Sequence, residues 1–354
     1  MTNDIKKLDP KREETDVTAN LAWHDALNLT IEGQGWENLE SPFDRLPIYA
    51  KEKFSALHWR FSKNSAGIAI RFITNSPSMG VTWATVKDEQ MRNMTSNGAN
   101  GLDLYVKYKN EWRWLAVGKA DGGKIHKREL FSNLEPVLRE YLLYLPLYNA
   151  CESLKIGITK DASIQPAPKR KKAPILFYGT SIVQGACASR AGMCHASIIG
   201  RKLNLPIINL GFAGNGKMEI EMAELLCETN PAIFVIDCLP NLEEPTVTER
   251  TEPFILLLRK KKNDTPILLI DNILYAQSYL DKTTMARYLT SNCAQYMAFE
   301  KLQASGVKNL HYLKDDGLLG DDYEGTVDGT HPNDLGFMRM AEMIGKKIKS
   351  ILQS

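Results

Sequence analysis

A serine, an aspartate and a histidine stand at positions where together they could carry out nucleophilic acyl transfer. Ser181 follows the apolar run 175–178 and Gly179, and the late segment VDGTHPND contains Asp328 and His331. A serine hydroxyl is a weak nucleophile that needs a base, and the imidazole of His331 could accept its proton. The carboxylate of Asp328 could hold that imidazole in the required tautomer and stabilise the imidazolium. The sequence therefore predicts a triad of Ser181, His331 and Asp328.

Two further residues could stabilise the negative charge that develops on an acyl oxygen during such a reaction. Gly214 lies in the segment GFAGNG, where backbone N–H groups can face a reacting centre, and Asn241 has a side-chain amide that donates without titrating. With the backbone N–H of Ser181, they form a predicted oxyanion hole. Each residue also has an ordinary interpretation, with Ser181 as a helix cap and Gly214 and Asn241 as turn residues. Their coincidence in one region favours the catalytic interpretation.

The elements that must position these residues are strands alternating with helices after Pro174. Five continuous apolar runs indicate strands covered on both faces: PILFYG, PIINLG, AIFVID, PILLIDN and NLHYLK. Helices are expected through 201, over about 218–228 and 246–261, up to about 304, and over 334–353. This alternation predicts an α/β fold with a flavodoxin-like, doubly wound parallel sheet. The candidate residues follow the strands, where ligands bind in such sheets.

The preceding part of the chain predicts an antiparallel, jelly-roll-like β-sandwich. In GLDLYVKYKNEWRWLAVG, apolar and polar residues alternate as in a half-buried strand, and a turn and a second strand follow. ALHWRFS, GIAIRFIT, GVTWATV and KIGIT are further expected strands. We expect an N-terminal extension over 1–20, the β-sandwich over 21–165, a linker over 166–173 that includes the basic run 169–172, and the catalytic domain over 174–354.

The tryptophans are confined to the first third of the chain. The six positions are Trp23, Trp36, Trp59, Trp83, Trp112 and Trp114. They could be core residues or platforms for sugar rings. Because the junction between the two parts is short and contains prolines, we expect fixed contact between the domains. The β domain is then expected to shape the site or to hold a polymeric substrate.

The segments GTSIVQG, NLGFAGNG, LPN and DGTHPND, in this order, resemble the SGNH hydrolases, also called the GDSL esterase family. The resemblance covers about residues 174–354. It implies that Ser181, Gly214, Asn241 and His331 are the residues after which the family is named, that Asp328 completes the triad, and that the first three supply the oxyanion hole. GLDLYVK is similar to the Gly-x-Asp-Leu-Tyr signature of a β domain that precedes some of these hydrolases.

Two positions depart from the family pattern. Thr180 stands where the family often has an aspartate, so the usual polar contact of that aspartate is not expected. The third segment is LPN instead of Gly-x-Asn-Asp, and Asn241 is the candidate that follows the third strand.

The residues and the resemblance together predict a serine esterase that removes short acyl groups, with acetyl on a carbohydrate as the expected substrate. The expectation of a carbohydrate substrate rests on the tryptophan-rich domain and on what similar two-domain enzymes imply. A lipase or thioesterase acting on an acyl lipid is the alternative enzyme. A non-catalytic binding protein that kept the fold is the alternative outside the enzymes.

Composition and charge narrow the class of partner. The chain has 354 residues, of which 44% are hydrophobic, and a net charge of +2 gives no reason to expect nucleic acid as a partner. The sequence contains no apolar run of about 18 residues, so no membrane-spanning helix is predicted. The expected partner is a small-molecule or oligosaccharide ester, and the oligomeric state stays open. The chain reads as cytoplasmic, or as periplasmic or secreted if a signal peptide has been removed.

No metal or cofactor is expected from the sequence. None of the six cysteines forms a CxxC or CxxH pair, which argues against a zinc site of that spacing. Asp321, Asp322 and Glu324 form an acidic cluster that does not match the spacing of an EF-hand loop, and we expect a solvated loop. The triad mechanism itself requires no metal.

Overall fold

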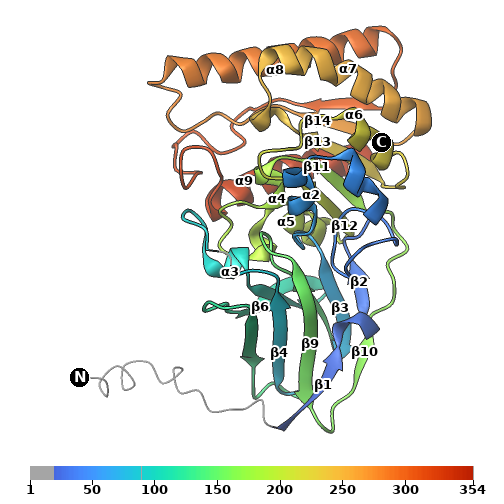
Figure 1. Ribbon diagram of the computed structural model, residues 1–354, viewed down its shortest axis with the longest axis vertical. Helices are drawn as coiled ribbons and strands as arrows, with labels where there is room; N and C mark the ends of the chain where they lie inside the picture. The colour runs from blue at the N-terminus through green and yellow to red at the C-terminus, as the bar shows by residue number, and fades with distance from the viewer. Residues whose placement is uncertain (1–19, 89, 354) are drawn as a thin grey trace.

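The computed structural model describes residues 20–88 and 90–353, so the extension predicted over 1–20 lies outside the described residues apart from residue 20. A β-rich body packs against a body in which strands and helices alternate (Figure 1). The β-rich body lies below in Figure 1 and the α/β body above. In the described part of the chain, no helix combines the length and the apolar character needed to cross a bilayer.

The α/β body is built on a parallel sheet of five strands in the order β12-β11-β13-β14-β15. The strands are β11 (Ile175–Gly179), β12 (Ile207–Gly211), β13 (Ile233–Asp237), β14 (Ile267–Ile270) and β15 (Leu310–Leu313). Strands β11 to β14 are buried along their whole length, as their continuous apolar runs predict. This is the strand order of a flavodoxin-like sheet, so the predicted fold class is confirmed.

Helices cover both faces of this sheet (Figure 1). One face packs against α5 (His195–Leu203) and α9 (Asp334–Gln353), and the other against α6 (Ile220–Leu226), α7 (Glu244–Lys261) and α8 (Lys282–Ala304). The helical stretch predicted up to residue 201 is interrupted, and that prediction is wrong in its middle. The helix α4 (Ser181–Gln184) ends because Gly185 has a left-handed φ of 104°, and a 3-10 turn η5 (Ala191–Met193) precedes α5.

The β-rich body consists of two antiparallel sheets that share one core. One sheet contains β1 (Leu21–Asp25), β9 (Cys151–Thr159), β4 (Met79–Thr85) and β7 (Ile125–Phe131) in that order. The other contains β10 (Ile164–Pro166), β3 (Ala69–Thr74), β8 (Arg139–Tyr144), β5 (Leu102–Tyr108) and β6 (Glu111–Gly118), with β2 (Thr30–Glu32) paired to β3. Trp83, Phe72 and Leu104 lie in the shared core, which confirms the predicted sandwich. Short turns are η3 (Ala26–Asn28), η4 (Ile48–Lys53) and α3 (Ser96–Ala99).

ALHWRFS is a helix, so its prediction as a strand is wrong. The helix α2 (Ala56–Ser62) begins after Ser55, whose hydroxyl accepts a hydrogen bond from the His58 N–H at 3.2 Å. Trp59 and Phe61 pack against the core of the α/β body, beside α6 and α7. Seven residues are too few for alternation to separate a strand from a helix, and the cap and the contact with the second body decide the outcome.

The segment GLDLY joins the two bodies through Asp103 and Tyr105. The Asp103 carboxylate is fully buried and accepts hydrogen bonds from Arg190 Nη1 and the Gly192 N–H, both at 2.8 Å. Arg190 also donates to the Tyr105 hydroxyl at 2.5 Å. A Cβ on Gly192 would lie 2.4 Å from the Tyr105 ring, so the close approach requires glycine. Strand β5 was predicted to be half-buried, but the α/β body also covers its second face at Asp103 and Tyr105, whereas Lys107 is half-buried.

Arg45 forms a second anchor between the bodies. Its buried guanidinium donates to the carbonyl of Asn64 at 2.7 Å and to that of Gly211 at 2.6 Å. Gly211 is the last residue of β12, so the β-rich body braces the strand end that carries the segment GFAGNG. Burial lowers the pKa of Arg45 to about 9, which still leaves the side chain charged at neutral pH.

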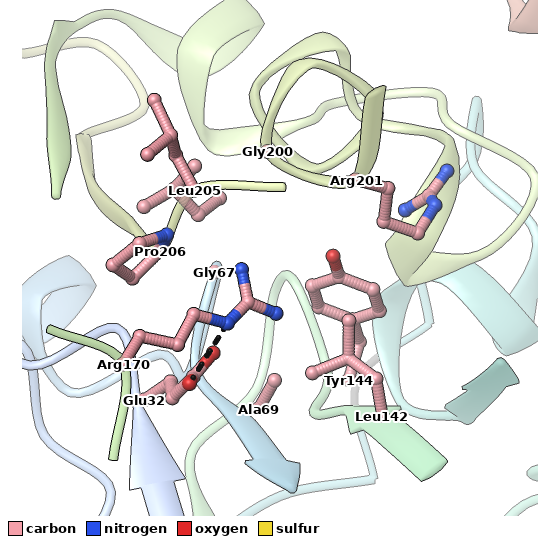
Figure 2. Close-up of a pocket in the computed structure, with 11 residues that line it drawn as sticks. Glu32, Gly67, Ala69, Leu142, Tyr144, Arg170, Gly200, Arg201, Leu205 and Pro206 are labelled. Atoms are coloured by element: carbon pink, nitrogen blue, oxygen red, sulfur yellow. Dashed lines mark ion pairs between the residues drawn. The ribbon is translucent and has the colours of Figure 1, made fainter. Parts of the chain in front are cut away.

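One cavity between the two bodies is small, with a volume of about 10 Å³. Residues from both bodies line it, among them Glu32, Tyr144, Arg170 and Leu205 (Figure 2). This volume is about that of a single water probe. Arg170 belongs to the basic run of the predicted linker, and its Nε lies 3.2 Å from the Glu32 carboxylate. The linker is therefore attached to the β-rich body at this point.

We expect Asp103→Ala to lower the free energy of unfolding by about 3 kcal/mol, because Arg190 and the Gly192 N–H lose their buried acceptor. Urea unfolding followed by tryptophan fluorescence measures this loss. Asp121→Ala is the matched control, since it removes an exposed partner of Arg128, and should cost less than about 1 kcal/mol. Equal losses in the two variants would contradict the docking role of Asp103.

Candidate active site

Ser181, His331 and Asp328 lie within hydrogen-bonding reach of one another beyond the carboxyl end of β11. The Oγ of Ser181 is 3.0 Å from Nε2 of His331, and Nδ1 of His331 is 2.9 Å from Oδ2 of Asp328. The His331 and Asp328 side chains are 25% and 32% exposed, so a ligand from solvent can reach them. The imidazole of His331 thus lies between the hydroxyl of Ser181 and the carboxylate of Asp328.

Thr180 leaves the Ser181 hydroxyl available. Ser181 is the first residue of α4, and the helix is capped by Thr180, whose hydroxyl accepts a hydrogen bond from the Ile182 N–H at 3.3 Å. The interpretation of Ser181 as the helix cap is therefore wrong. A Cβ on Gly216 would lie 2.0 Å from the carbonyl oxygen of Gly179, so glycine is required where the next loop crosses the end of β11.

A compact loop presents Asp328 and His331. The Oδ1 of Asp328 accepts hydrogen bonds from the N–H groups of Thr330 and His331 at 3.2 and 2.8 Å, as in an Asx turn. Partial burial alone would raise the pKa of Asp328, but hydrogen bonds from His331 and Asn93 outweigh it and lower the pKa to about 2. The carboxylate is consequently ionised at neutral pH, as its position beside the imidazole requires.

Gly214 and Asn241 lie on two neighbouring loops at the same edge of the sheet. Gly214 is exposed and has a φ of 68°, which favours glycine. Asn241 ends the 3-10 turn η6 (Leu239–Asn241), and one of its amide N–H groups donates to the carbonyl of Asn215 at 2.7 Å. A carboxamide has a second N–H, which leaves one donor for a ligand.

The β-rich body reaches this region through two side-chain contacts. The amide of Gln184, which is fully buried in α4, donates to the carbonyl of Leu147 and accepts from the Ala213 N–H, both at 3.0 Å. The Tyr148 hydroxyl donates to the carbonyl of Ser181 at 3.3 Å. Both Ser181 and the loop of Gly214 are therefore supported from the other body.

Asn93 is the residue of the site that sequence reasoning missed. It lies between β4 and α3, and its Nδ2 donates to Oδ2 of Asp328 at 2.7 Å, the oxygen that also faces His331. Its neighbours fix the loop, since Met94 is buried and the Thr95 hydroxyl donates to the carbonyl of Ser189 at 2.5 Å. No local pattern marks Asn93, because its partner is 235 residues away in the chain.

The acidic cluster has a structural partner in α9. Two oxygens of Asp322 accept hydrogen bonds from Arg339 at 2.7 and 2.8 Å. These bonds are the main reason why the pKa of Asp322 falls to about 2. The cluster therefore ties the loop before Asp328 to α9.

Most of the tryptophans serve the core or the contact between the bodies. Trp83 is buried in the sandwich core. The indole N–H of Trp36 donates to Glu228 at 2.8 Å, that of Trp112 to Asn204 at 3.4 Å, and that of Trp114 to Asp103 at 2.9 Å. Their concentration in the first third of the chain thus reflects, for these residues, packing and domain docking.

Comparison with known proteins finds two families along the chain. Residues 171–349 match the GDSL-like lipase/acylhydrolase family, and residues 21–164 match the GxDLY family, the N-terminus of SGNH-hydrolase-type esterases. A GDSL-like lipase from Bacteroides ovatus ATCC 8483 is 38% identical, with a TM-score of 0.90 over 94% of this chain and 98% of that one. No curated protein sequence matches the chain.

More distant structures share the fold. The salicylyl-acyltransferase SsfX3 from a tetracycline biosynthetic pathway is 17% identical, with a TM-score of 0.77 over 94% of this chain and 98% of that one. A family two carbohydrate esterase from Clostridium thermocellum, in complex with cellohexaose, is 16% identical, with a TM-score of 0.58 over 81% of this chain and 93% of that one. At these identities the similarity shows the fold alone.

We expect Asn93→Ala to raise the pKa of Asp328 above its value of about 2, because the variant loses a hydrogen bond that favours the ionised carboxylate. NMR titration of carboxyl-labelled aspartate measures this change. Arg92→Ala, on the same loop and exposed, is the matched control and should leave the titration unchanged. An Asp328 titration that is identical in Asn93→Ala and the wild type would show that the contact is not formed in solution.

Proposed function

Because the chain belongs to the GDSL-like lipase/acylhydrolase family, we propose that it is a serine esterase whose catalytic triad is Ser181, His331 and Asp328. The observation that carries this proposal is the 3.0 Å contact between Ser181 Oγ and Nε2 of His331. A hydroxyl at this distance from an imidazole nitrogen is placed for proton transfer. We also propose that residues 174–354 form the catalytic domain, that 21–165 form the β domain, and that 166–173 join them.

In the proposed reaction, Ser181 attacks the acyl carbon of an ester while His331 takes the hydroxyl proton. The ionised Asp328 stabilises the imidazolium that forms and holds the ring in one orientation. When the tetrahedral intermediate collapses, the bond to the alcohol breaks and His331 returns the proton to the leaving oxygen. Water then attacks the acyl-enzyme, with His331 again as the base, and releases the acid and the free serine.

The backbone N–H groups of Ser181 and Gly214 and the free amide N–H of Asn241 are the proposed donors to the oxyanion. Their orientation is set before substrate binds, since Gln184 holds the loop of Gly214 and Asn215 holds Asn241. Donors that need no reorganisation stabilise the transition state more than the ground state. This predicts an effect on kcat rather than on substrate affinity.

The proposed substrate is a short acyl ester, with acetyl on a carbohydrate as the first choice. Amide side chains lie on the loops around the proposed triad: Asn93 and Gln277 approach the Asp328 loop, and the Asn241 amide donates to the backbone carbonyl of Asn215. Such groups suit the hydroxyls of a sugar better than an acyl chain. The family two carbohydrate esterases, which share the fold, add to this choice. A lipase or thioesterase is the alternative, and the length of acyl chain accepted separates the two.

The β domain has a proposed role in building the site. Asn93 acts as a positioning residue, because it touches the carboxylate of Asp328 and acts on the reaction only through it. Leu147 and Tyr148 of the β domain give a similar support, since the Leu147 carbonyl accepts a hydrogen bond from Gln184 and the Tyr148 hydroxyl donates to the Ser181 carbonyl. The catalytic domain alone lacks these partners.

Acetate should be released from acetylated oligosaccharides by the wild type and not by Ser181→Ala, because the variant lacks the nucleophile. A p-nitrophenyl ester series from acetate to long acyl chains, run beside it, should favour acetate. Enzymatic measurement of acetate gives the first rate and absorbance the second. Near-wild-type turnover by Ser181→Ala would refute the serine mechanism, whereas a preference for long chains would favour the lipase alternative.

Asn241→Ala should lower kcat by roughly 10²–10³, the usual effect of removing one oxyanion donor. KM should change little, because the donor acts mainly on the transition state. Steady-state kinetics on p-nitrophenyl acetate separates the two constants. A rise in KM at constant kcat would reassign Asn241 to substrate binding.

A further inference from the structure

A buried thiol lies beside the proposed catalytic pair. Cys187 follows α4, is 6% exposed, and its Sγ has no hydrogen-bond partner in the described part of the chain. Its φ of 70° lies in the left-handed region, which residues with a Cβ rarely adopt. One ligand atom from each of Cys187, Asp328 and His331 lies within 4.8 Å of the other two. The fold therefore keeps an unbonded thiol against an imidazole and a carboxylate.

We propose that Cys187, Asp328 and His331 form a binding site for a thiol-seeking divalent cation such as Zn²⁺ or Cd²⁺, and that the bound ion inhibits the enzyme. Among residues 20–88 and 90–353, this is the one group of three or more His, Cys, Asp or Glu side chains whose ligand atoms approach so closely. Thiolate, imidazole and carboxylate are the ligands that zinc takes in proteins. The thiol selects against Mg²⁺ and Ca²⁺, which prefer oxygen ligands alone.

Small side-chain movements suffice to bind the ion. Bonds of about 2.0–2.3 Å in a tetrahedral arrangement place ligand atoms about 3.5 Å apart. Since no two of the three ligand atoms are more than 4.8 Å apart, no pair has to close by more than about 1.3 Å. The partial exposure of the His331 and Asp328 side chains gives the ion a path from solvent, and water can fill the fourth position. Cys187 lies at the buried side of the group.

Binding of the cation releases the thiol proton of Cys187. Burial, with a contribution from the charge of Asp328, raises the pKa of Cys187 to about 12, so the free thiol holds its proton at neutral pH. A coordinating thiol gives this proton up to solvent, and the neutral imidazole binds through a nitrogen lone pair. No oxidation or reduction occurs. Because the ion occupies His331, the imidazole no longer serves as a base for Ser181. Inhibition rests on the proposed function, whereas cation binding does not.

The test uses the full-length protein after treatment with a chelator. Cd²⁺ should produce the ultraviolet charge-transfer absorption of a cadmium–thiolate bond in the wild type and in Cys293→Ser, the control at an exposed cysteine. Cys187→Ser should lack this absorption and should bind Zn²⁺ at least about tenfold more weakly in calorimetry. Cys187→Gly gives a second variant, because glycine suits the left-handed backbone at this position.

Inhibition is measured by hydrolysis of p-nitrophenyl acetate. For each variant, the rate with metal is compared with the rate of the same variant without metal. Zn²⁺ should inhibit the wild type and Cys293→Ser at concentrations that leave both Cys187 variants active, and a chelator should restore the rate. Equal binding and equal inhibition in the wild type and the Cys187 variants would overturn the site. If the thiolate absorption depends on Cys187 but hydrolysis continues with the ion bound, the cation site stands and the assignment of the triad fails.

Discussion

Asp103 constrains how the two bodies of this protein meet. A carboxylate buried away from water is costly unless it is paired and hydrogen-bonded, and burial raises the pKa of Asp103 even against the opposing charge of Arg190. Its oxygens accept hydrogen bonds from Arg190 and Gly192 of the α/β body and from Trp114 of its own sheet. Displacing the bodies would break these bonds and leave the charge unpaired, so the contact favours one register.

The stretch that surrounds Arg190 connects this domain contact to the loops that carry Asn93 and His331. The carbonyl of Ser189 accepts a hydrogen bond from Thr95, on the loop that carries Asn93. The N–H and hydroxyl of Ser189 bond to Asp334, the first residue of α9, which directly follows the loop of His331. Ser189 thus fixes two elements beside Asp328. One is the loop of Asn93, which contacts the Asp328 carboxylate, and the other is α9, which begins where the loop of Asp328 and His331 ends. The domain contact and the candidate site are therefore linked by hydrogen bonds of Ser189.

The parallel sheet, and the closeness of Ser181, His331 and Asp328, could be predicted from the sequence because their signals are local. A strand covered on both faces is a continuous apolar run, and Ser181, Asp328 and His331 each stand within a short segment of recognisable chemistry. The prediction of ALHWRFS as a strand is wrong because contact with the α/β body favours a helix, and no local pattern in the sequence reports that contact. Asn93 could not be predicted for the same reason, since its hydrogen-bond partner lies 235 residues away in the chain. Cys187 likewise gains its neighbours only through the fold.

In the proposed function, the β domain is part of the active site, and the two are expected to unfold together. Urea unfolding of the full-length chain tests this directly, because all six tryptophans lie in the first third of the sequence and their fluorescence reports that domain and its contact with the α/β body. Hydrolysis of p-nitrophenyl acetate, followed at the same urea concentrations, reports the triad. The two signals should be lost in one coincident transition. Hydrolysis that persists after the fluorescence transition is complete would contradict it.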